Sequence, residues 1–85
     1  MEARISAQSI IHRERTILAS AVTLTKREQE VLHWAAEGKS EWEIGLILGL
    51  SEHTAEKFIR SARIKLHAGN RTHAVARAIR LGLIA

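Results

Sequence analysis

Residues 53–66 of this 85-residue chain carry side chains that could recognise a ligand by charge and hydrogen bonding. At helical spacing, an apolar face of this stretch would hold Ala55, Phe58, Ile59, Ala62 and Leu66. The opposite face would present His53, Glu56, Lys57, Arg60 and Ile64. A helix that is anchored by one face and cationic on the other fits the major groove of DNA, which admits one helix.

The exposed residues of this stretch differ in what they could read. Arg60 is the best candidate for a base contact, because its planar fork matches O6 and N7 of guanine, and Lys57 is the next. Glu56 could accept a hydrogen bond from cytosine N4, or be a solvated charge paired with Arg60 four residues later. His53 could contact a phosphate or have no role. Ile64 could meet a thymine methyl group or be covered at the helix end.

Phosphate contacts are expected on both sides of this stretch. Lys39 and Ser40 lie where a predicted helix starts, and free N–H groups and the helix dipole favour an anion there. The full set of predicted phosphate contacts is Lys39, Ser40, His53, Thr54, Arg63, Lys65, Arg71 and Thr72. Each of these side chains could instead be merely exposed.

The charge of the chain is strongly uneven. All nine acidic residues are Glu, and the last of them is Glu56. Residues 1–56 hold six basic residues against these nine, a balance of −3, whereas residues 57–85 hold seven basic residues and no acid, a balance of +7. A basic, acid-free C-terminal third indicates a polyanionic partner, most simply nucleic acid. A solvated basic surface is the alternative.

Several classes of function are disfavoured by composition. The chain has no Cys, and its five His lack partners at metal-ligand spacing. With no nucleophile–base pair apparent, we expect no enzyme activity, no metal and no cofactor. No apolar run approaches the roughly 20 residues that a membrane helix needs, and Arg4, Arg13 and Arg15 interrupt the apolar region of a signal peptide. We therefore expect no membrane partner.

The elements that must position these residues are helices, and the length allows one small domain. Capping boxes at Thr25/Glu28 and Ser40/Glu43 and an N-cap at Ser51 mark three helix starts. The predicted helices are 26–37, 41–48, 52–66 and 73–81, the last with Thr72 as its cap. The sequence thus predicts an all-α domain over residues 23–85 with four helices and no strands.

The link between the second and third predicted helices is Gly49-Leu50-Ser51. Three residues cannot reverse the chain into an antiparallel pair, so the two helices must cross steeply. Gly49 supplies the left-handed conformation at the corner, and Gly45 is small where the next helix must pass. This spacing is typical of a helix-turn-helix. The alternative is an ordinary helical hairpin with a glycine stop.

The two ends of the chain have different patterns. In the last predicted helix, Val75 and Ile79 would face the core, and a second stripe consists of Ala74, Ala78 and Leu81. We interpret this second stripe as a homodimer contact, with core filling as the alternative. Residues 1–22 have an amphipathic pattern of moderate quality, and we expect a linker, helical or partly frayed. A dimer seam or part of a neighbouring domain are the other options.

Residues 24–84 resemble the DNA-binding domain of the LuxR family of bacterial transcription regulators. The resemblance depends on many matched positions, among them Leu24-Thr25, Gly38-Lys39-Ser40, Glu43-Ile44, Lys65-Leu66 and Asn70-Arg71. Trp34 and Trp42-Glu43-Ile44 are similar to the subgroup that senses acyl-homoserine lactones in quorum sensing. Five positions depart from the usual pattern: Gly45, Ala55, Glu56, Phe58 and Ser61.

The resemblance implies a four-helix unit that dimerises through its last helix and binds an inverted repeat in double-stranded DNA. It also implies groove contacts from Glu56, Lys57 and Arg60, and phosphate contacts near Lys39, Thr54 and Arg71. An inducer would bind a domain absent from this chain, RNA polymerase is a further candidate partner, and the expected location is cytoplasmic, at the nucleoid. The acidic Glu56 also motivates an alternative: a module without DNA binding that sequesters a related regulator through residues 1–22 and the last helix.

Overall fold

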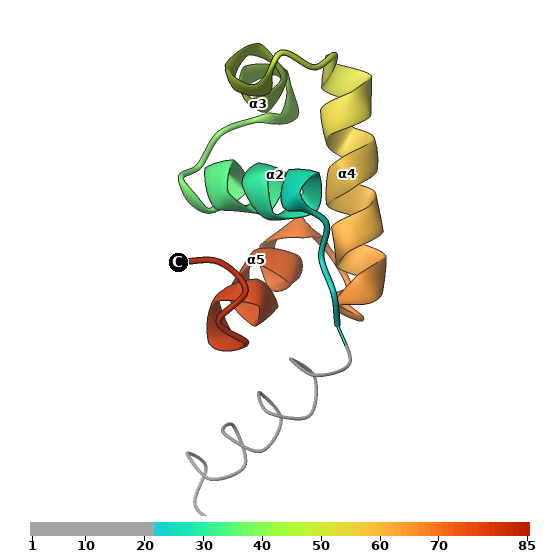
Figure 1. The fold of residues 1–85 in the computed structure, drawn as a ribbon, viewed down its shortest axis with the longest axis vertical. Helices are drawn as coiled ribbons and strands as arrows, with labels where there is room; N and C mark the ends of the chain where they lie inside the picture. Colours follow the sequence, from blue (N-terminus) through green and yellow to red (C-terminus); the bar gives the residue numbers. More distant parts are fainter. Residues whose placement is uncertain (1–21) are drawn as a thin grey trace, which may run out of the picture.

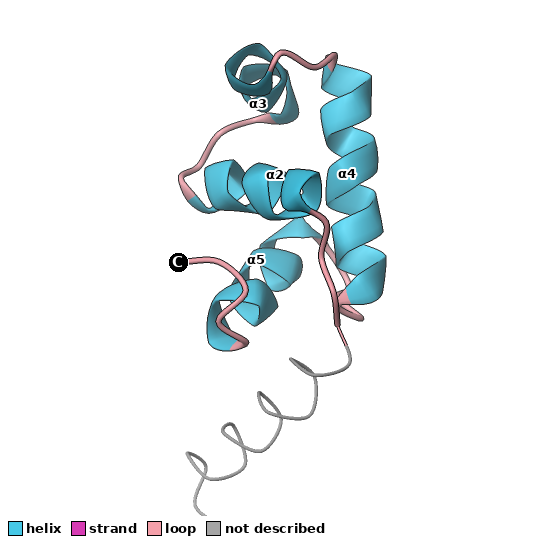
Figure 2. Ribbon diagram, in the orientation of Figure 1, coloured by secondary structure: helices cyan, strands magenta, loops and turns pink. Residues whose placement is uncertain are grey.

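The computed structural model describes residues 22–85, which form four helices joined by short links (Figure 1). The helices are α2 (Lys26–Ala36), α3 (Glu41–Leu48), α4 (Glu52–Lys65) and α5 (Arg71–Arg80). These residues contain no strand (Figure 2), and the predicted all-α class is confirmed. The linker predicted at 1–22 lies outside the described residues except for Val22, which is buried.

The longest of these helices, α4, has 14 residues and runs along one side of the domain (Figure 1). From its N-terminal to its C-terminal end, α3, α2 and α5 lie beside it in that order. Each of the three packs against α4. The direction of α4 is therefore set by three separate helix contacts.

Each of these helices starts after a residue whose side-chain oxygen accepts a hydrogen bond from the backbone N–H three residues later. These N-caps are Thr25, Ser40, Ser51 and Asn70. Both predicted capping boxes are present. The prediction of Thr72 as the last cap is wrong: Asn70 Oδ1 accepts from the N–H of His73 at 2.9 Å. Asn caps helices at least as well as Thr, so α5 begins two residues earlier than predicted.

The corner between α3 and α4 depends on two glycines. Gly49 is left-handed, with φ 72°, as predicted. A Cβ atom at Gly45 would lie 2.5 Å from the carbonyl oxygen of Leu50. The N–H of Leu50 donates back to the Gly45 carbonyl at 2.8 Å. The small residue in α3 therefore makes room mainly for the backbone of the link and only at its edge for the start of α4.

The core consists of two clusters that both include α4. In the first, Val31 of α2 and Ile44 of α3 pack with Ala55 and Ile59 of α4. The second joins α2, α4 and α5, and its members include Leu32, Ala62, Leu66, Ala74, Ala78 and Leu81. Val31 and Leu32 are adjacent and have no exposed surface. Val31 belongs to the first cluster and Leu32 to the second, so α2 contributes to both.

The face of α5 that enters the core differs from the one predicted, although Val75 is partly buried against the same cluster. Ala74 and Ala78 have no exposed surface and Leu81 only 7%, whereas Ile79 is 45% exposed. The prediction that Ala74, Ala78 and Leu81 contact a second copy is therefore wrong, because side chains enclosed by their own chain cannot reach another. Their small size lets α5 approach α2 and α4 closely. The alternative, core filling, is correct.

Candidate nucleic-acid interface

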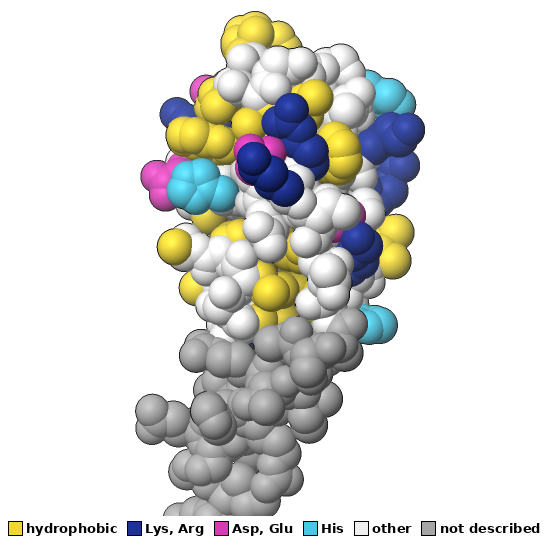
Figure 3. Space-filling view, viewed as in Figure 1, with side chains coloured by type: hydrophobic (Ala, Val, Ile, Leu, Met, Phe, Trp, Pro, Cys, Tyr) yellow, Lys and Arg dark blue, Asp and Glu magenta, His cyan; other side chains and the backbone are white. Residues whose placement is uncertain are grey.

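The two faces of α4 are as predicted except at Phe58, which is only partly buried. Ala55, Ile59, Ala62 and Leu66 are buried, with at most 5% of any of them exposed. On the opposite face, His53, Lys57 and Arg60 are exposed, and Ile64 is 62% exposed. Lys and Arg side chains gather along the edge of the domain that α4 forms (Figure 3). A rigidly anchored helix thus presents a basic face outward.

Glu56 and Arg60 form an ion pair on this exposed face. Arg60 Nη2 donates to both Glu56 oxygens at 2.6 Å. The side chains are 40% and 51% exposed for Glu56 and Arg60. An exposed pair of this spacing contributes only about 0.3–0.5 kcal/mol to stability. The pair therefore fixes the direction of the guanidinium more than it stabilises the fold.

The start of α3, where Lys39 and Ser40 were predicted to hold a phosphate, is occupied by its own capping box. The Ser40 hydroxyl accepts from Glu43 N–H at 3.2 Å, and a Glu43 carboxylate oxygen accepts from Ser40 N–H at 2.9 Å. The backbone N–H and then the hydroxyl of Ser40 lower the pKa of Glu43. The Ser40 N–H is thus already bound to a carboxylate.

Arg71 connects the start of α5 to the start of α3. Its guanidinium donates to the Glu41 carboxylate and to the Lys39 carbonyl oxygen. These partners lie 30 and 32 residues away in the chain. The predicted phosphate contacts Lys39 and Arg71 are thereby brought together, and Arg71 also ties two helices.

Lys65 and Glu28 form a second link between helices, which sequence reasoning missed. Lys65 Nζ lies 2.8 Å from a Glu28 oxygen, and the Ser61 hydroxyl donates to the other oxygen at 2.5 Å. Glu28 is 3% exposed and also caps α2 by accepting from Thr25 N–H. The ammonium of Lys65 is thus held by a buried carboxylate, and the phosphate contact predicted for Lys65 stays a prediction.

The environment of Glu28 favours its charged form. Burial alone would raise the pKa of this carboxyl group. Hydrogen bonds from Lys65, Ser61 and the Thr25 N–H outweigh the burial, and the net effect is a lowered pKa. Glu28 is therefore an ionised, fully partnered group that fastens the start of α2 to the C-terminal half of α4.

The remaining predicted phosphate contacts include Thr54 and Arg63 of α4 and Thr72 of α5. The Thr54 hydroxyl accepts from Ser51 Oγ at 2.9 Å in the first turn of α4. Arg63 Nη1 donates to the Ala68 carbonyl at 3.4 Å. Thr72 is exposed in the first turn of α5. A polar pocket between α3, α4 and α5 is lined by Glu41, Glu56, Ile59, Arg60, Arg63, Asn70 and Arg71.

A family model described as bacterial regulatory proteins of the luxR family matches residues 22–78. The chain belongs to the LuxR family. The matched region contains α2, α3, the Gly49 corner and α4, so this LuxR-type domain is a DNA-binding helix-turn-helix domain of the kind found in transcription regulators. The predicted family is confirmed.

Curated relatives of this LuxR-type domain are named as transcription regulators. Transcriptional activator protein BjaR1 of Bradyrhizobium diazoefficiens is 57% identical over 61 residues, which are 72% of this chain and 25% of the relative. The quorum sensing-dependent regulator RpaR of Rhodopseudomonas palustris is 54% identical over 72% of this chain and 25% of its own length. LuxR of Aliivibrio fischeri is 49% identical over 72% of this chain and 24% of its own length. The chain thus spans about a quarter of the length of these relatives.

The LuxR-type domain also exposes apolar side chains on α3. Trp42 is 59% exposed, Leu46 65% and Ile47 44%. The short α3 turns only Ile44 and Gly45 fully inward. Apolar side chains are visible over α3 at the top of Figure 3. We refer to Trp42, Leu46 and Ile47 as the α3 apolar patch.

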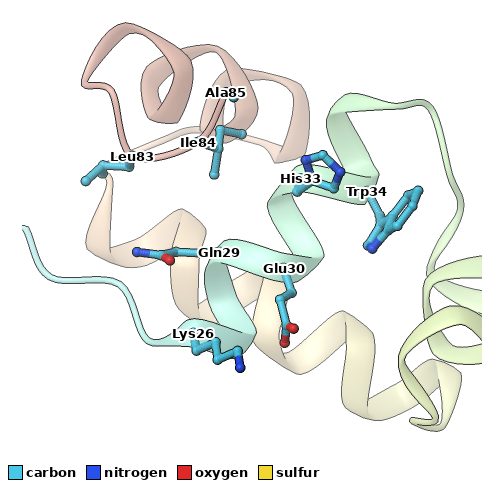
Figure 4. A pocket seen from close by; sticks show the side chains of 8 residues that line it. All are labelled: Lys26, Gln29, Glu30, His33, Trp34, Leu83, Ile84 and Ala85. Atoms are coloured by element: carbon cyan, nitrogen blue, oxygen red, sulfur yellow. The ribbon is translucent and has the colours of Figure 1, made fainter.

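Figure 4 shows a shallow pocket between α2 and the C-terminal segment. Its polar side chains Lys26, Gln29 and Glu30 come from α2, and Leu83 and Ile84 form the other wall. Leu83 N–H donates to the Ala78 carbonyl at 2.9 Å, which holds this segment against the domain. Within residues 22–85, no group of three or more His, Cys, Asp or Glu could hold a metal, and no helix could span a membrane.

Proposed function

We propose that this LuxR-type domain binds an inverted-repeat DNA site as a homodimer, with α4 in the major groove, as the effector part of a quorum-sensing regulator. The observation that carries the proposal is the exposed basic face of α4 on a helix whose other face is buried. The names of RpaR and the other relatives support the regulatory role.

Within this proposal, Glu56, Lys57 and Arg60 contact bases, since they share the exposed face of α4. Phosphates are contacted by the side chains that flank it: Lys39, Ser40, His53, Thr54, Arg63, Arg71 and Thr72. Arg71 is bound to Glu41, so a phosphate would share its guanidinium with that carboxylate. Ser40 would act through its exposed hydroxyl, because its N–H is bound to Glu43.

The homodimer uses the outward face of α5 in place of the alanine face predicted from sequence. Ile79 is 45% exposed and Val75, one turn earlier, is partly buried. A two-fold dimer would bring two copies of α4 into successive major grooves, with half-sites about 34–36 Å apart. An inverted repeat follows from that symmetry.

RNA polymerase is the proposed partner of the α3 apolar patch, because a patch beside a DNA-reading helix is available to a protein bound at neighbouring DNA. Trp42→Ala should leave DNA affinity unchanged and abolish activation from a promoter that carries the site. Measuring binding by fluorescence anisotropy and transcription with purified polymerase separates the two effects. Equal loss in both assays would contradict this assignment. An inducer would bind a part of the full-length regulator that lies outside the region matched by this chain.

The comparisons give no support to the alternative in which the chain sequesters a regulator without binding DNA. A binding titration of the 85-residue chain against duplexes selected from a random pool tests the proposed function. The logarithm of the binding constant should fall linearly with the logarithm of the salt concentration. Each neutralised phosphate should add about 0.9 to the steepness of this slope. A flat salt dependence, or equal affinity for scrambled duplexes, would overturn the proposal.

A further inference from the structure

We propose that Glu56 and Arg60 read one G·C base pair together, with Arg60 on the guanine and Glu56 on its paired cytosine. The inference rests on the proposed function, in which α4 lies in the major groove. It gives the carboxylate on this face, which otherwise only opposes the charge of DNA, a direct role in specificity.

The ion pair leaves both side chains able to bind a base. Arg60 Nη2 donates to both carboxylate oxygens at 2.6 Å. An arginine has five N–H donors and an ionised carboxylate about four acceptor sites. Only one of the three guanidinium nitrogens is used in the ion pair, and each Glu56 oxygen retains a lone pair. The paired groups therefore present donors and, directly beside them, an acceptor.

The major-groove edge of a G·C pair has the complementary order. From guanine to cytosine it presents the acceptors N7 and O6 and then the N4 donor. O6 and N4 are joined by a Watson–Crick hydrogen bond of about 2.7–3.2 Å. This spacing resembles the 2.6 Å between Arg60 Nη2 and the Glu56 oxygens. The Arg60 fork can thus bind N7 and O6 while Glu56 accepts from N4.

Each of the other base pairs lacks part of this order. A T·A pair offers the thymine O4 acceptor and the adenine N6 donor, but it has no second acceptor on the thymine side for the Arg60 fork. An A·T pair would place the adenine N6 donor against the Arg60 donors. The reversed pair, C·G, would place a guanine acceptor against the Glu56 carboxylate. The ion pair therefore selects G·C in one orientation.

Arginines on one side of Glu56 reduce the repulsion between its charge and the phosphates, whereas a second pocket on Glu56 is lined by Glu41, Glu52 and His53. Glu56 and Arg60 line the polar pocket that Arg63 and Arg71 also line. The other carboxylate of that pocket, Glu41, is paired with Arg71. The pocket thus combines three arginines with two glutamates, and its excess of positive charge favours DNA at close range.

Selection of bound duplexes from a random pool tests the coupling, with the wild-type chain, Glu56→Ala, Arg60→Ala and the double variant. We expect the wild type to enrich one oriented G·C pair. Each single variant should lower discrimination at that same pair by on the order of tenfold to hundredfold, and the double variant should lower it no further. Glu52→Ala is the matched control, because it also removes an exposed carboxylate from the start of α4.

The control distinguishes recognition of a base by Glu56 from the general electrostatic effect of removing a carboxylate. Glu52→Ala and Glu56→Ala each remove a negative charge and should raise non-specific affinity, but only Glu56→Ala should lower discrimination at the G·C pair. If Glu56→Ala raises affinity and leaves the preference unchanged, or if the single variants affect different base pairs, the coupled reading is overturned. A wild-type chain that enriches no sequence would instead overturn the proposed function, and the coupled reading with it.

Discussion

Two basic residues of this domain join helices. The charged ends of Lys65 and Arg71 are bound to Glu28 and Glu41 on other helices, and Arg71 is in addition a proposed phosphate contact. These partners are 37 and 30 residues away, so no local pattern in the sequence reveals them. The Glu56–Arg60 pair is four residues apart, and helical spacing alone suggested it as one of two options.

Glu28 should make the stability of the domain depend on pH. Its folded pKa is lowered, so its contribution is complete above the pKa of the unfolded chain and is lost as pH falls through the lower, folded pKa. Glu28→Gln should reduce the free energy of unfolding at pH 7 by about 1.5–3 kcal/mol, the range for hydrogen bonds to charged groups. Urea denaturation at pH 7 and at pH 3 should show a smaller difference at pH 3.

The control for this change is Glu30→Gln on the same helix. Glu30 pairs with Arg27 at the surface, with Arg27 44% and Glu30 32% exposed. Its removal should change stability by at most about 1 kcal/mol at either pH. A Glu28 effect as small as that of Glu30, or one that does not shrink in acid, would contradict the role assigned to Glu28.

Two lysines of α4 should respond differently to substitution. Lys57 is exposed on the outward face, so Lys57→Ala should lower DNA affinity, and the loss of its charge from the interface should reduce the slope of log K against log salt. Lys65→Ala should lower stability instead, because it leaves the Glu28 carboxylate without its cation. Anisotropy titrations across salt, combined with urea denaturation, distinguish the two. Equal salt slopes for both variants would contradict this division.

At the scale of elements, the sequence predicted the starts of α2, α3 and α4 because each start has a local cause, a side chain that caps its own backbone. The faces of α4 were also predictable, since one continuous apolar stripe could only be buried. The inward face of α5 was not, because this helix has two apolar stripes. Which stripe is buried depends on how closely α5 approaches α2 and α4, and the alanine stripe allows the closer approach.

The corrected orientation of α5 can be tested by enlarging a buried alanine. Ala78 has no exposed surface and packs where α5 meets the second core cluster. Ala78→Leu should therefore lower the free energy of unfolding by about 1–3 kcal/mol through overpacking. Thermal and urea denaturation measure this cost, and Ile79→Ala, on the exposed face, is the matched control and should change stability little. An Ala78→Leu variant as stable as the wild type would contradict the inward placement.

For the molecule as a whole, the proposed dimer predicts that a change on α5 can lower DNA affinity without lowering the stability of the single domain. Ile79 is exposed on α5, away from the basic face of α4. Ile79→Lys should leave the single domain folded but add a charge where the second copy would pack. We expect weaker association in sedimentation equilibrium and a large loss of affinity for an inverted repeat.

A duplex with only one half-site provides the discriminating measurement for this variant, because a single domain suffices to bind it. Affinity for the half-site should be equal in Ile79→Lys and wild type, apart from the small gain from one added cation. Binding of the inverted repeat should lose its cooperativity, because each domain must then bind independently. If Ile79→Lys binds the inverted repeat as tightly as the wild type does, the second copy does not pack on this face of α5.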